Sequence, residues 1–451
     1  MQIKQFEDNN LAHYSYAVID HGEMIIIDPS RDPKPYYELA AQKDAVITAV
    51  IETHPHADFI SSHLEVHHAT GATVYVSKLA GAAYPHHPFD EGDRHGLGMG
   101  TFRAINTPGH SADSISIILT DESGKDIAVF TGDALLIGDC GRPDLRENVG
   151  NVQQTRQDQA RQLFYALKKY LHLDDEVLVY PAHGSGSLCG RVLSAAKNST
   201  IGAEKLSNWC LQPMELDAFT SALLAGQSFV PAYFPYDVEM NRTGAPDFGK
   251  SVASVSIGSP VFDQLAAGSL DHKIVIIDTR SQRAYKTAHL RNSINLQAGP
   301  KFETWLGSIL SPGEPFYLAV DEQEEIMRLL GRIAKIGYEI FIQEAFLLKY
   351  GDISSPEIDL SHFKKNMDDF TLIDVRNTEE AVTTPFERSI HIPLHQLRER
   401  ISEIPLDRPL VVYCSSGYRS AAASSLISSK LPGKVTVFDL GESVNEFMQA
   451  T

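Results

Sequence analysis

The chain has 451 residues, which is enough for two to four domains that each bury a core of their own. Its hydrophobic content of 43% and charged content of 22% are those of an ordinary globular protein. The formal net charge of −19 argues against a protein that binds nucleic acid or a membrane surface, because such a chain repels polyanions. A local basic pocket for a small anion stays compatible with it.

The first 200 residues alternate strand-like and helical segments. A β-hairpin is predicted over 10–30, and strand 46–52 follows a helical stretch after Pro33. Residues 58–69 indicate a helix with Asp58 near its start. Further elements are expected as strands near 73–77, 101–106, 114–119, 127–131 and 176–180 and as a helix over 153–171. This order predicts α/β layers with two sheets.

Four polar segments in this region each follow an apolar run and carry a metal-type ligand. A single histidine after a strand is generally packed or solvated, but four such points are hard to explain by chance. Ligands that converge from the ends of several strands are a common way for a rigid sheet to hold a metal. The candidate donors are His54, His56, Asp58, His110, Asp133 and His183.

The signals for cellular location come from the N-terminus and the cysteines. The first residues lack the regions of a signal peptide, and no apolar run approaches the ~20 residues that span a bilayer. Cys140, Cys189, Cys210 and Cys414 are widely spread, so we expect reduced thiols in a cytoplasmic protein without membrane attachment. A small buried side chain is the favoured interpretation of Cys140 and Cys189, and a reactive thiol is the alternative.

The rest of the chain contains an internal repeat. Residues 192–227 indicate mainly helix, and 228–254, rich in Pro, Gly and aromatics, indicates a linker or a segment that wraps a neighbouring surface. KIVIIDTR (273–280) then parallels FTLIDVR (370–376), and each is followed by a second apolar strand and a helix. We therefore predict a first domain over 1–227 and two related βα domains over 255–350 and 355–451.

The second repeat carries a cysteine loop, Cys414-Ser-Ser-Gly-Tyr-Arg419, between an apolar strand and a helix. Backbone N–H groups and the helix dipole at such a loop favour a thiolate, so Cys414 is expected to have a lowered pKa and to be nucleophilic. Arg419 would add positive charge for an anionic substrate. The alternative is a structural cysteine at a strand end. In the first repeat the equivalent position falls near Val320, before acidic residues, so that repeat is expected to be catalytically silent.

The histidine pattern resembles the metallo-β-lactamase superfamily, whose HxHxDH motif is here His54-Pro-His56-Ala-Asp58-Phe59. Members with two zinc ions commonly have a histidine where this chain has Phe59, so a dinuclear site is disfavoured. Two histidines and one carboxylate suit a single Fe(II) with open positions, and zinc is the alternative. No organic cofactor is expected.

Longer segments resemble the persulfide dioxygenase branch of that superfamily: TPGHS (107–111), TGDALLIGDCGRPD (131–144) and YPAHGSGSLCGR (180–191). The resemblance implies that His54, His110 and Asp133 hold the iron. His56, Asp58 and His183 are then supporting groups or additional ligands. Arg142, Tyr180 and Arg191 are candidate substrate-binding residues, although an ion pair is an equal explanation for the two arginines.

Together with the Asp374-Val-Arg376 strand and the DLGESVNEF tail, the cysteine loop resembles the rhodanese family of sulfurtransferases. The resemblance implies that Cys414 takes up sulfane sulfur as a persulfide. Arg419 and the loop residues Ser415, Ser416, Gly417 and Tyr418 would bind the substrate. The expected fold is therefore α/β multidomain, with an N-terminal αββα metallo-β-lactamase fold followed by two α/β rhodanese-like domains.

These resemblances imply an iron dioxygenase that oxidises a low-molecular-weight persulfide, such as glutathione or coenzyme A persulfide, with O₂ to sulfite. Cys414 would then interconvert persulfide plus sulfite with thiosulfate, and tethering would raise the effective concentration of the shared sulfur pool. One alternative is a zinc thioester hydrolase of glyoxalase II type with a rhodanese tail. Another is that the C-terminal half is a sulfur carrier or docking module. We also expect a homo-oligomer, because the aromatic segment 228–251 could wrap a second copy.

Overall fold

The computed structural model describes residues 1–145, 154–190, 194 and 196–448. The chain forms two compact units, residues 1–251 with 334–337 and residues 252–333 with 338–451. They are called the N-terminal and C-terminal units below. Within the described part of the chain, no helix combines the length and apolar character that crossing a bilayer requires.

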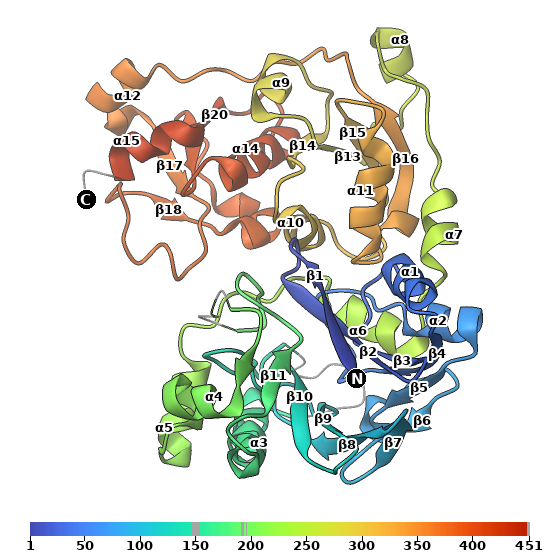
Figure 1. The fold of residues 1–451 in the computed structure, drawn as a ribbon. Coiled ribbons are helices and arrows are strands. Elements are labelled where there is room, and N and C mark those ends of the chain that lie inside the picture. Colours follow the sequence, from blue (N-terminus) through green and yellow to red (C-terminus); the bar gives the residue numbers. More distant parts are fainter. Residues whose placement is uncertain (146–153, 191–193, 195, 449–451) are drawn as a thin grey trace. The chain divides into compact units, whose positions relative to one another are not determined.

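The N-terminal unit contains two six-stranded sheets (Figure 1). The first has its strands in sequence order: β1 (Gln2–Asp8), β2 (His13–Asp20), β3 (Glu23–Ile27), β4 (Val46–Ile51), β5 (Thr73–Val76) and β6 (His87–Pro88). The second runs in the reverse of sequence order: β12 (Ser199–Thr200), β11 (Leu178–Pro181), β10 (Asp126–Gly132), β9 (Ile115–Thr120), β8 (Gly100–Asn106) and β7 (Arg94–Leu97). The predicted strands are confirmed, and β1 is an additional strand paired antiparallel with β2.

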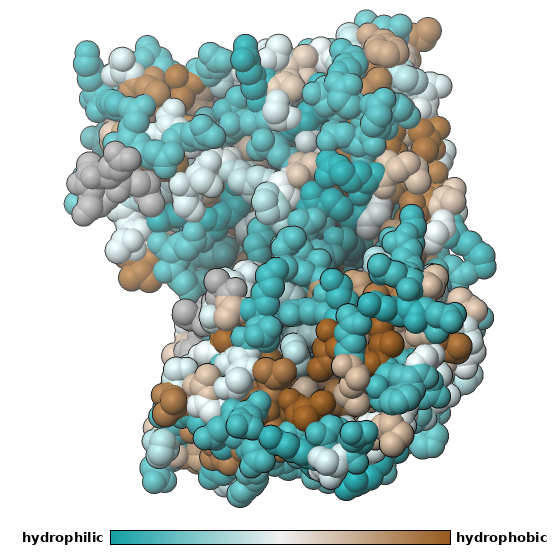
Figure 2. Space-filling model, in the orientation of Figure 1, coloured by the Kyte–Doolittle hydropathy of each residue, from teal (hydrophilic) through white to brown (hydrophobic). Residues whose placement is uncertain are grey.

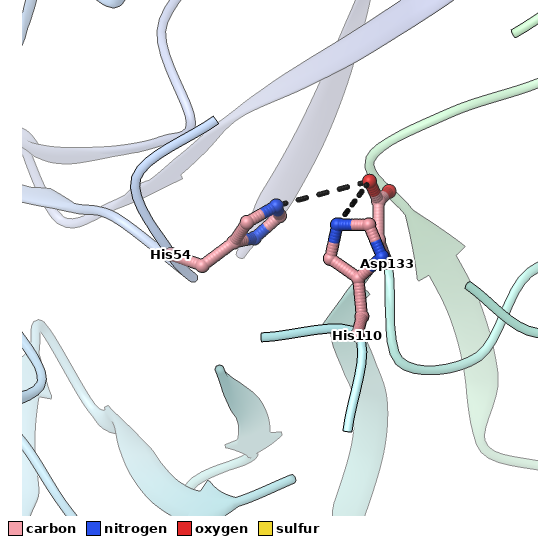
Figure 3. Close-up of side chains that lie close together, drawn as sticks. All are labelled: His54, His110 and Asp133. Atoms are coloured by element: carbon pink, nitrogen blue, oxygen red, sulfur yellow. Dashed lines mark ion pairs between the residues drawn. The ribbon is translucent and has the colours of Figure 1, made fainter. Parts of the chain in front are cut away.

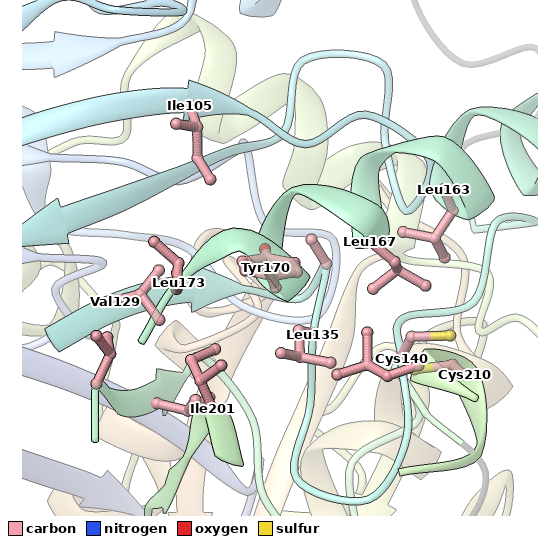
Figure 4. Packing of buried hydrophobic residues seen from close by; sticks show 14 of the residues in the cluster. Ile105, Val129, Leu135, Cys140, Leu163, Leu167, Tyr170, Leu173, Ile201 and Cys210 are labelled. Carbon is pink, nitrogen blue, oxygen red and sulfur yellow. The ribbon is translucent and has the colours of Figure 1, made fainter. Parts of the chain in front are cut away.

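Three apolar layers hold this unit together. Side chains of both sheets form the central layer, which includes Ile25, Phe102 and Phe130. The outer face of the first sheet packs on α1 (Lys34–Gln42) and α2 (His63–Thr70). The outer face of the second packs on α3 (Arg156–Leu167), with α4 (Ile201–Ser207) and α5 (Leu216–Leu224) (Figure 4). The result is the expected αββα arrangement, because each sheet buries both faces.

One expectation for this unit is corrected. The helix predicted over 58–69 begins only at His63, so Asp58 lies in the preceding loop. Residues 228–254, predicted as a linker or a segment that wraps a neighbouring surface, contain α6 (Phe234–Thr243) and α7 (Phe248–Ala253). Pro235 stands in the first turn of α6, where its missing N–H costs nothing.

The C-terminal unit contains two parallel four-stranded sheets with the same strand order. The first is β14 (Ser293–Asn295), β13 (Val275–Asp278), β15 (Phe316–Val320) and β16 (Ile342–Leu347). The second is β18 (Ile390–His391), β17 (Thr371–Asp374), β19 (Leu410–Tyr413) and β20 (Val437–Asp439). The helices of this unit are α8 (Gln264–Ala267), α9 (Gln282–Thr287), α10 (Phe302–Ile309), α11 (Glu325–Ala334), α12 (Leu360–Lys365), α13 (Leu397–Arg400), α14 (Tyr418–Lys430) and α15 (Asn445–Met448).

The repeated Asp-x-Arg sequence has the same structural role in both sheets. Arg280 forms a buried ion pair with Asp278 at 2.7 Å, where β13 ends. Arg376 pairs with Asp374 at 2.6 Å at the end of β17. A buried charge is tolerated only with such a partner, so the repeat in the sequence reflects two copies of one βα module.

The surface is consistent with the acidic composition. Most side chains on the face drawn in Figure 2 are hydrophilic, with smaller hydrophobic areas between them. The large apolar side chains that are exposed are scattered along the chain, as Val46, Leu206 and Leu265 illustrate. Such scattered residues are normal on a globular protein and do not define a binding surface.

Candidate metal centre and cysteine loop

The predicted metal donors come together at one end of the two sheets of the N-terminal unit. His54 follows β4, His110 lies between β8 and β9, and Asp133 follows β10 directly (Figure 3). Their donor atoms lie within 4.8 Å of one another, and all three side chains are buried. The Nε2 atoms of His54 and His110 are 3.8 and 3.5 Å from the same oxygen, Asp133 Oδ2.

Neighbouring groups determine which nitrogen of His54 faces this point. The Thr53 hydroxyl donates to Asp28 Oδ2 at 2.8 Å, and its oxygen lies 3.0 Å from His54 Nδ1. Because the hydroxyl hydrogen is directed to Asp28, the Thr53 oxygen accepts the proton of His54 Nδ1. His54 Nε2 is then unprotonated and directs its lone pair toward Asp133.

His110 and Asp133 are also held so that an unprotonated atom of each faces this point. His110 Nδ1 donates to the carbonyl oxygen of Arg142 at 2.9 Å, since a carbonyl can only accept, and Nε2 is again the lone-pair atom. Asp133 Oδ1 accepts from His183 Nδ1 at 2.7 Å. Asp133 Oδ2 is buried and has no hydrogen-bond partner among the described residues. Three lone pairs therefore meet at one point, as a metal ion requires.

A glycine allows this close approach. A Cβ atom on Gly141 would lie 2.2 Å from the Asp133 carbonyl oxygen and 2.8 Å from His110 Nδ1. Such contacts are too short for any other residue, so the glycine of the GDCGRPD segment is explained by packing against two donors.

The three remaining predicted donors form a second group. His56, Asp58 and His183 are buried and also have donor atoms within 4.8 Å of one another. His183 Nε2 lies 2.9 Å from Asp58 Oδ2, and His56 Nε2 lies 3.3 Å from Asp28 Oδ1. His183 thus contacts Asp133 and Asp58 with its two nitrogens, an arrangement in which a protein group orients a ligand.

The charges of these groups shift their pKa values. Burial acts to raise the pKa of Asp133, but the charge and hydrogen bond of His183 outweigh it and, with His110 and His54 nearby, hold the pKa well below its usual range. Burial acts to lower the pKa of His183, and the charges of Asp133 and Asp58 outweigh it and raise the pKa well above the usual value. The centre therefore favours an ionised carboxylate.

Phe59 occupies the side of the site next to this second group. Its ring is buried and lies 4.4 Å from the ring of His56, measured between centroids. It also lies 3.9 Å from the ring of His13, a residue of β2 that the sequence patterns did not single out. Burial, together with His183 and His56, lowers the pKa of His13 well below its usual value, so His13 is neutral.

The predicted substrate-binding residues of this unit lie in different surroundings. Arg142 is buried, forms a bidentate pair with Asp144 at 2.7 Å and donates to Ser228, which matches the ion-pair explanation. Tyr180 stacks on Phe130 at the edge of the central layer. Arg191 lies outside the described residues. A substrate role stays a prediction for all three.

The four cysteines are buried free thiols. Cys140 and Cys210 both belong to the apolar layer beneath α3 (Figure 4). Burial raises the pKa of Cys189 to about 12, with a further contribution from Asp133. These environments fit small buried side chains.

Cys414 lies between β19 and α14, as predicted. Its side chain is buried, and Sγ accepts a hydrogen bond from the N–H of Gly417 at 3.2 Å. Gly417 has φ +94°, a conformation that favours glycine and that turns its N–H inward at the start of α14. Arg419 lies in the first turn of α14, and its side chain is mostly buried.

The first βα module contributes to the surroundings of this loop. The Tyr418 hydroxyl donates to the carbonyl oxygen of Gln297 at 2.8 Å, and Arg419 Cζ lies 5.9 Å from the centre of the Trp305 ring. In that module the loop after β15 instead holds Asp321 and Glu322, which pair with Lys349. Acidic side chains there are unsuited to binding an anion.

The fold and the donor cluster together define a metal-binding αββα protein with additional βα modules. A metallo-beta-lactamase superfamily model matches residues 8–183, and a rhodanese-like domain model matches residues 359–450. A hydroxyacylglutathione hydrolase of Francisella tularensis subsp. novicida is 31% identical over 187 residues, which are 41% of this chain and 68% of the relative. This chain therefore belongs to the metallo-beta-lactamase superfamily.

The similarity to one solved structure extends beyond the first unit. A metallo-beta-lactamase from Staphylococcus aureus subsp. aureus COL matches with a TM-score of 0.67 and 28% identity, covering 77% of this chain and 98% of that one. ETHE1 from Myxococcus xanthus matches with a TM-score of 0.46 and 29% identity, covering 54% and 98%. The chain is thus a multidomain α/β protein with a metallo-beta-lactamase domain and a C-terminal rhodanese-like domain.

Proposed function

We propose that this protein is an iron-dependent persulfide dioxygenase joined to a cysteine sulfurtransferase. The observation that carries the proposal is the donor set at the metal centre, two histidines and one carboxylate, with Phe59 in place of a further donor. The cysteine loop of the C-terminal unit supports sulfur as the element on which both sites act.

The donor set fits one metal ion. Two neutral imidazole nitrogens and one carboxylate oxygen on one side leave the opposite positions open, which is the arrangement of non-haem Fe(II) oxygenases. Fe(II) bound there would supply the activation of O₂. Asp28, through Thr53, and the carbonyl of Arg142 keep the two imidazoles in the tautomer that such an ion needs.

The overall reaction converts R–S–SH, O₂ and water into R–SH and sulfite with two protons, so the outer sulfur is oxidised and O₂ is reduced. The side chains of Phe59, His54 and His110 are buried, so the centre is shielded from bulk solvent. His183, held between Asp133 and Asp58, keeps the Asp133 carboxylate oriented.

The sulfurtransferase half rests on Cys414. The Gly417 N–H and the start of α14 stabilise negative charge on the sulfur. A persulfide on Cys414 would donate its outer sulfur to sulfite, giving thiosulfate and the free thiolate. Ser415, Ser416 and Tyr418 stay candidates for substrate contact, with Arg419 as the cation of the loop.

Replacing Asp133 tests the metal centre. We expect Asp133→Asn to lower O₂ uptake with glutathione persulfide by at least about 100-fold and to reduce bound iron, because the amide removes the anionic donor. Asp126→Asn, at the far end of the same strand, should leave both unchanged. Wild-type uptake by the iron-loaded Asp133→Asn protein would refute this centre.

Replacing Cys414 tests the proposed sulfurtransferase activity separately from the proposed dioxygenase activity. Cys414→Ser should abolish sulfur transfer from thiosulfate to cyanide, since a hydroxyl does not form the persulfide, while O₂ uptake stays within about twofold of wild type. Unchanged sulfur transfer would rule out Cys414 as the nucleophile. Mass spectrometry after exposure to thiosulfate also tests the docking-module alternative, which predicts no added sulfur.

A second candidate function is thioester hydrolysis with zinc. The curated relative named hydroxyacylglutathione hydrolase favours it, and the His56, Asp58 and His183 group offers further donors. Phe59 is the feature against it, because the ring adds no ligand atom at this position. Hydrolysis of S-lactoylglutathione by the zinc-loaded protein, with no O₂ uptake by the iron-loaded protein, would favour the hydrolase.

A further inference from the structure

Glu380 places a carboxylate against the cysteine loop. It belongs to the segment after β17 and reaches two side chains of the loop that follows β19. One carboxylate oxygen lies 2.8 Å from Arg419 Nη2 and accepts from the Ser415 hydroxyl at 3.0 Å, while the other contacts Arg419 Nη1. The second oxygen also accepts the N–H of Asn377 at 3.1 Å, which fixes the side chain from its own segment.

The charge of Arg419 is consequently neutralised within the protein. Its guanidinium pairs with the Glu380 carboxylate, and Cζ lies 5.9 Å from the centre of the Trp305 ring. Burial acts to raise the pKa of Glu380, but the hydrogen bonds and charge of Arg419 outweigh it and lower the pKa to about 2. The Glu380–Arg419 pair is thus fully charged at neutral pH and adds no net positive charge to the loop.

Backbone groups are the donors that face Cys414 Sγ directly. The Gly417 N–H points at Cys414 Sγ, and the thirteen-residue helix α14 begins at the next residue. One localised negative charge can be stabilised by such groups. A dianion would place its second charge close to the Glu380 carboxylate, where like charges repel.

We propose that Glu380 is a specificity residue that makes Cys414 accept sulfur from a persulfide R–S–SH, whose sulfane group carries at most one negative charge, in preference to the dianion thiosulfate. In this step the Cys414 thiolate attacks the outer sulfur of R–S–SH. A bond forms between Sγ and that sulfur, the S–S bond of the donor breaks, and the proton of the outer sulfur moves to the departing R–S⁻, which leaves as R–SH. This inference rests on the proposed sulfurtransferase function, and it makes thiosulfate a weakly held product of the loop.

The kinetic test compares Glu380→Gln with Glu379→Gln, an exposed neighbour in the same segment. For Glu380→Gln we expect the KM for thiosulfate to fall about tenfold, with kcat within about twofold, because the repulsion is removed while the amide still accepts a hydrogen bond. The KM for glutathione persulfide should change less than about threefold, and Glu379→Gln should behave as wild type. An unchanged or raised KM for thiosulfate in Glu380→Gln would overturn the inference.

A binding measurement separates this inference from the function on which it rests. Trp209→Phe leaves Trp305 as the one tryptophan of the chain, and Cys414→Ser prevents sulfur uptake. In that background, thiosulfate is titrated while Trp305 fluorescence is followed. If thiosulfate binds about tenfold more tightly to the Glu380→Gln protein, the inference is supported. Should the chain with Cys414 intact also fail to transfer sulfur, only the sulfurtransferase proposal fails. If the Glu380→Gln substitution does not tighten thiosulfate binding, or if no binding is detected, the inference about Glu380 is overturned. This holds even if the chain with Cys414 intact transfers sulfur.

Discussion

At the scale of single residues, Thr53 fixes the tautomer of His54, and so which ring nitrogen could bind a metal. Its hydroxyl relays between Asp28 and His54 Nδ1. Thr53→Val keeps the shape but removes the relay, so we expect iron affinity to fall about 10- to 100-fold. Thr53→Ser, which keeps the hydroxyl, should retain wild-type affinity. Equal iron affinity in Thr53→Val and wild type, measured by chelator competition, would contradict this role.

The low pKa of Glu380 makes a second prediction at this scale. Because the carboxyl is protonated only as pH approaches about 2, it keeps its charge from about pH 5 to about pH 8. The ratio of the thiosulfate KM of wild type to that of Glu380→Gln should therefore stay constant over this range. A ratio that falls toward one near pH 5 would show that the carboxylate is already neutral there.

The candidate metal donors were more predictable than the residues that orient them. His54, His110 and Asp133 each follow an apolar run, and this pattern placed them together correctly. Thr53 directly precedes His54, and His13 is the first residue of β2, so no spacing distinguishes them from other buried residues. Asp28 shows the same signal as the donors, a carboxylate directly after the apolar run MIII, but its partner lies in another strand.

At the scale of elements, α6 holds the loop that carries the HxHxD motif. The Asn241 amide donates to the carbonyl oxygens of His56 and Phe59, and its oxygen accepts the Ser61 N–H, each at 2.8 Å. Two of these groups, the Ser61 N–H and the Phe59 carbonyl, are ones that a helix beginning at Asp58 would otherwise satisfy. The helix begins later than predicted because the side chain of Asn241, about 180 residues away, takes the place of its first backbone hydrogen bonds. Local sequence patterns cannot reveal such a contact.

Removing this amide should loosen the metal loop. For Asn241→Ala we expect the free energy of unfolding of the N-terminal unit to fall by about 2–4 kcal/mol, because three buried polar groups lose their partner. Iron affinity should fall with it. Glu239→Ala, on the exposed side of α6, is the matched control for denaturant unfolding. A loss no larger than that of the control would show that the loop keeps its shape without Asn241.

At the scale of the whole molecule, the sheets and the internal repeat were predictable because hydrophobic periodicity dictates them. The Asp-x-Arg motif identified both βα modules, and the strand orders agree. What the first module contributes could not be predicted, because Gln297 and Trp305 reach the cysteine loop through tertiary packing. The first module, whose loop after β15 holds acidic residues, therefore contributes to the surroundings of the cysteine loop in the second.

The central claim is that the N-terminal unit holds a single iron ion. Two lone-pair nitrogens and one carboxylate oxygen converge there, and Phe59 replaces a donor at the neighbouring position. The direct measurement is the metal content of the full chain purified without added metal, by elemental analysis. The account predicts one iron per chain. Two zinc ions per chain would contradict it and favour the thioester hydrolase.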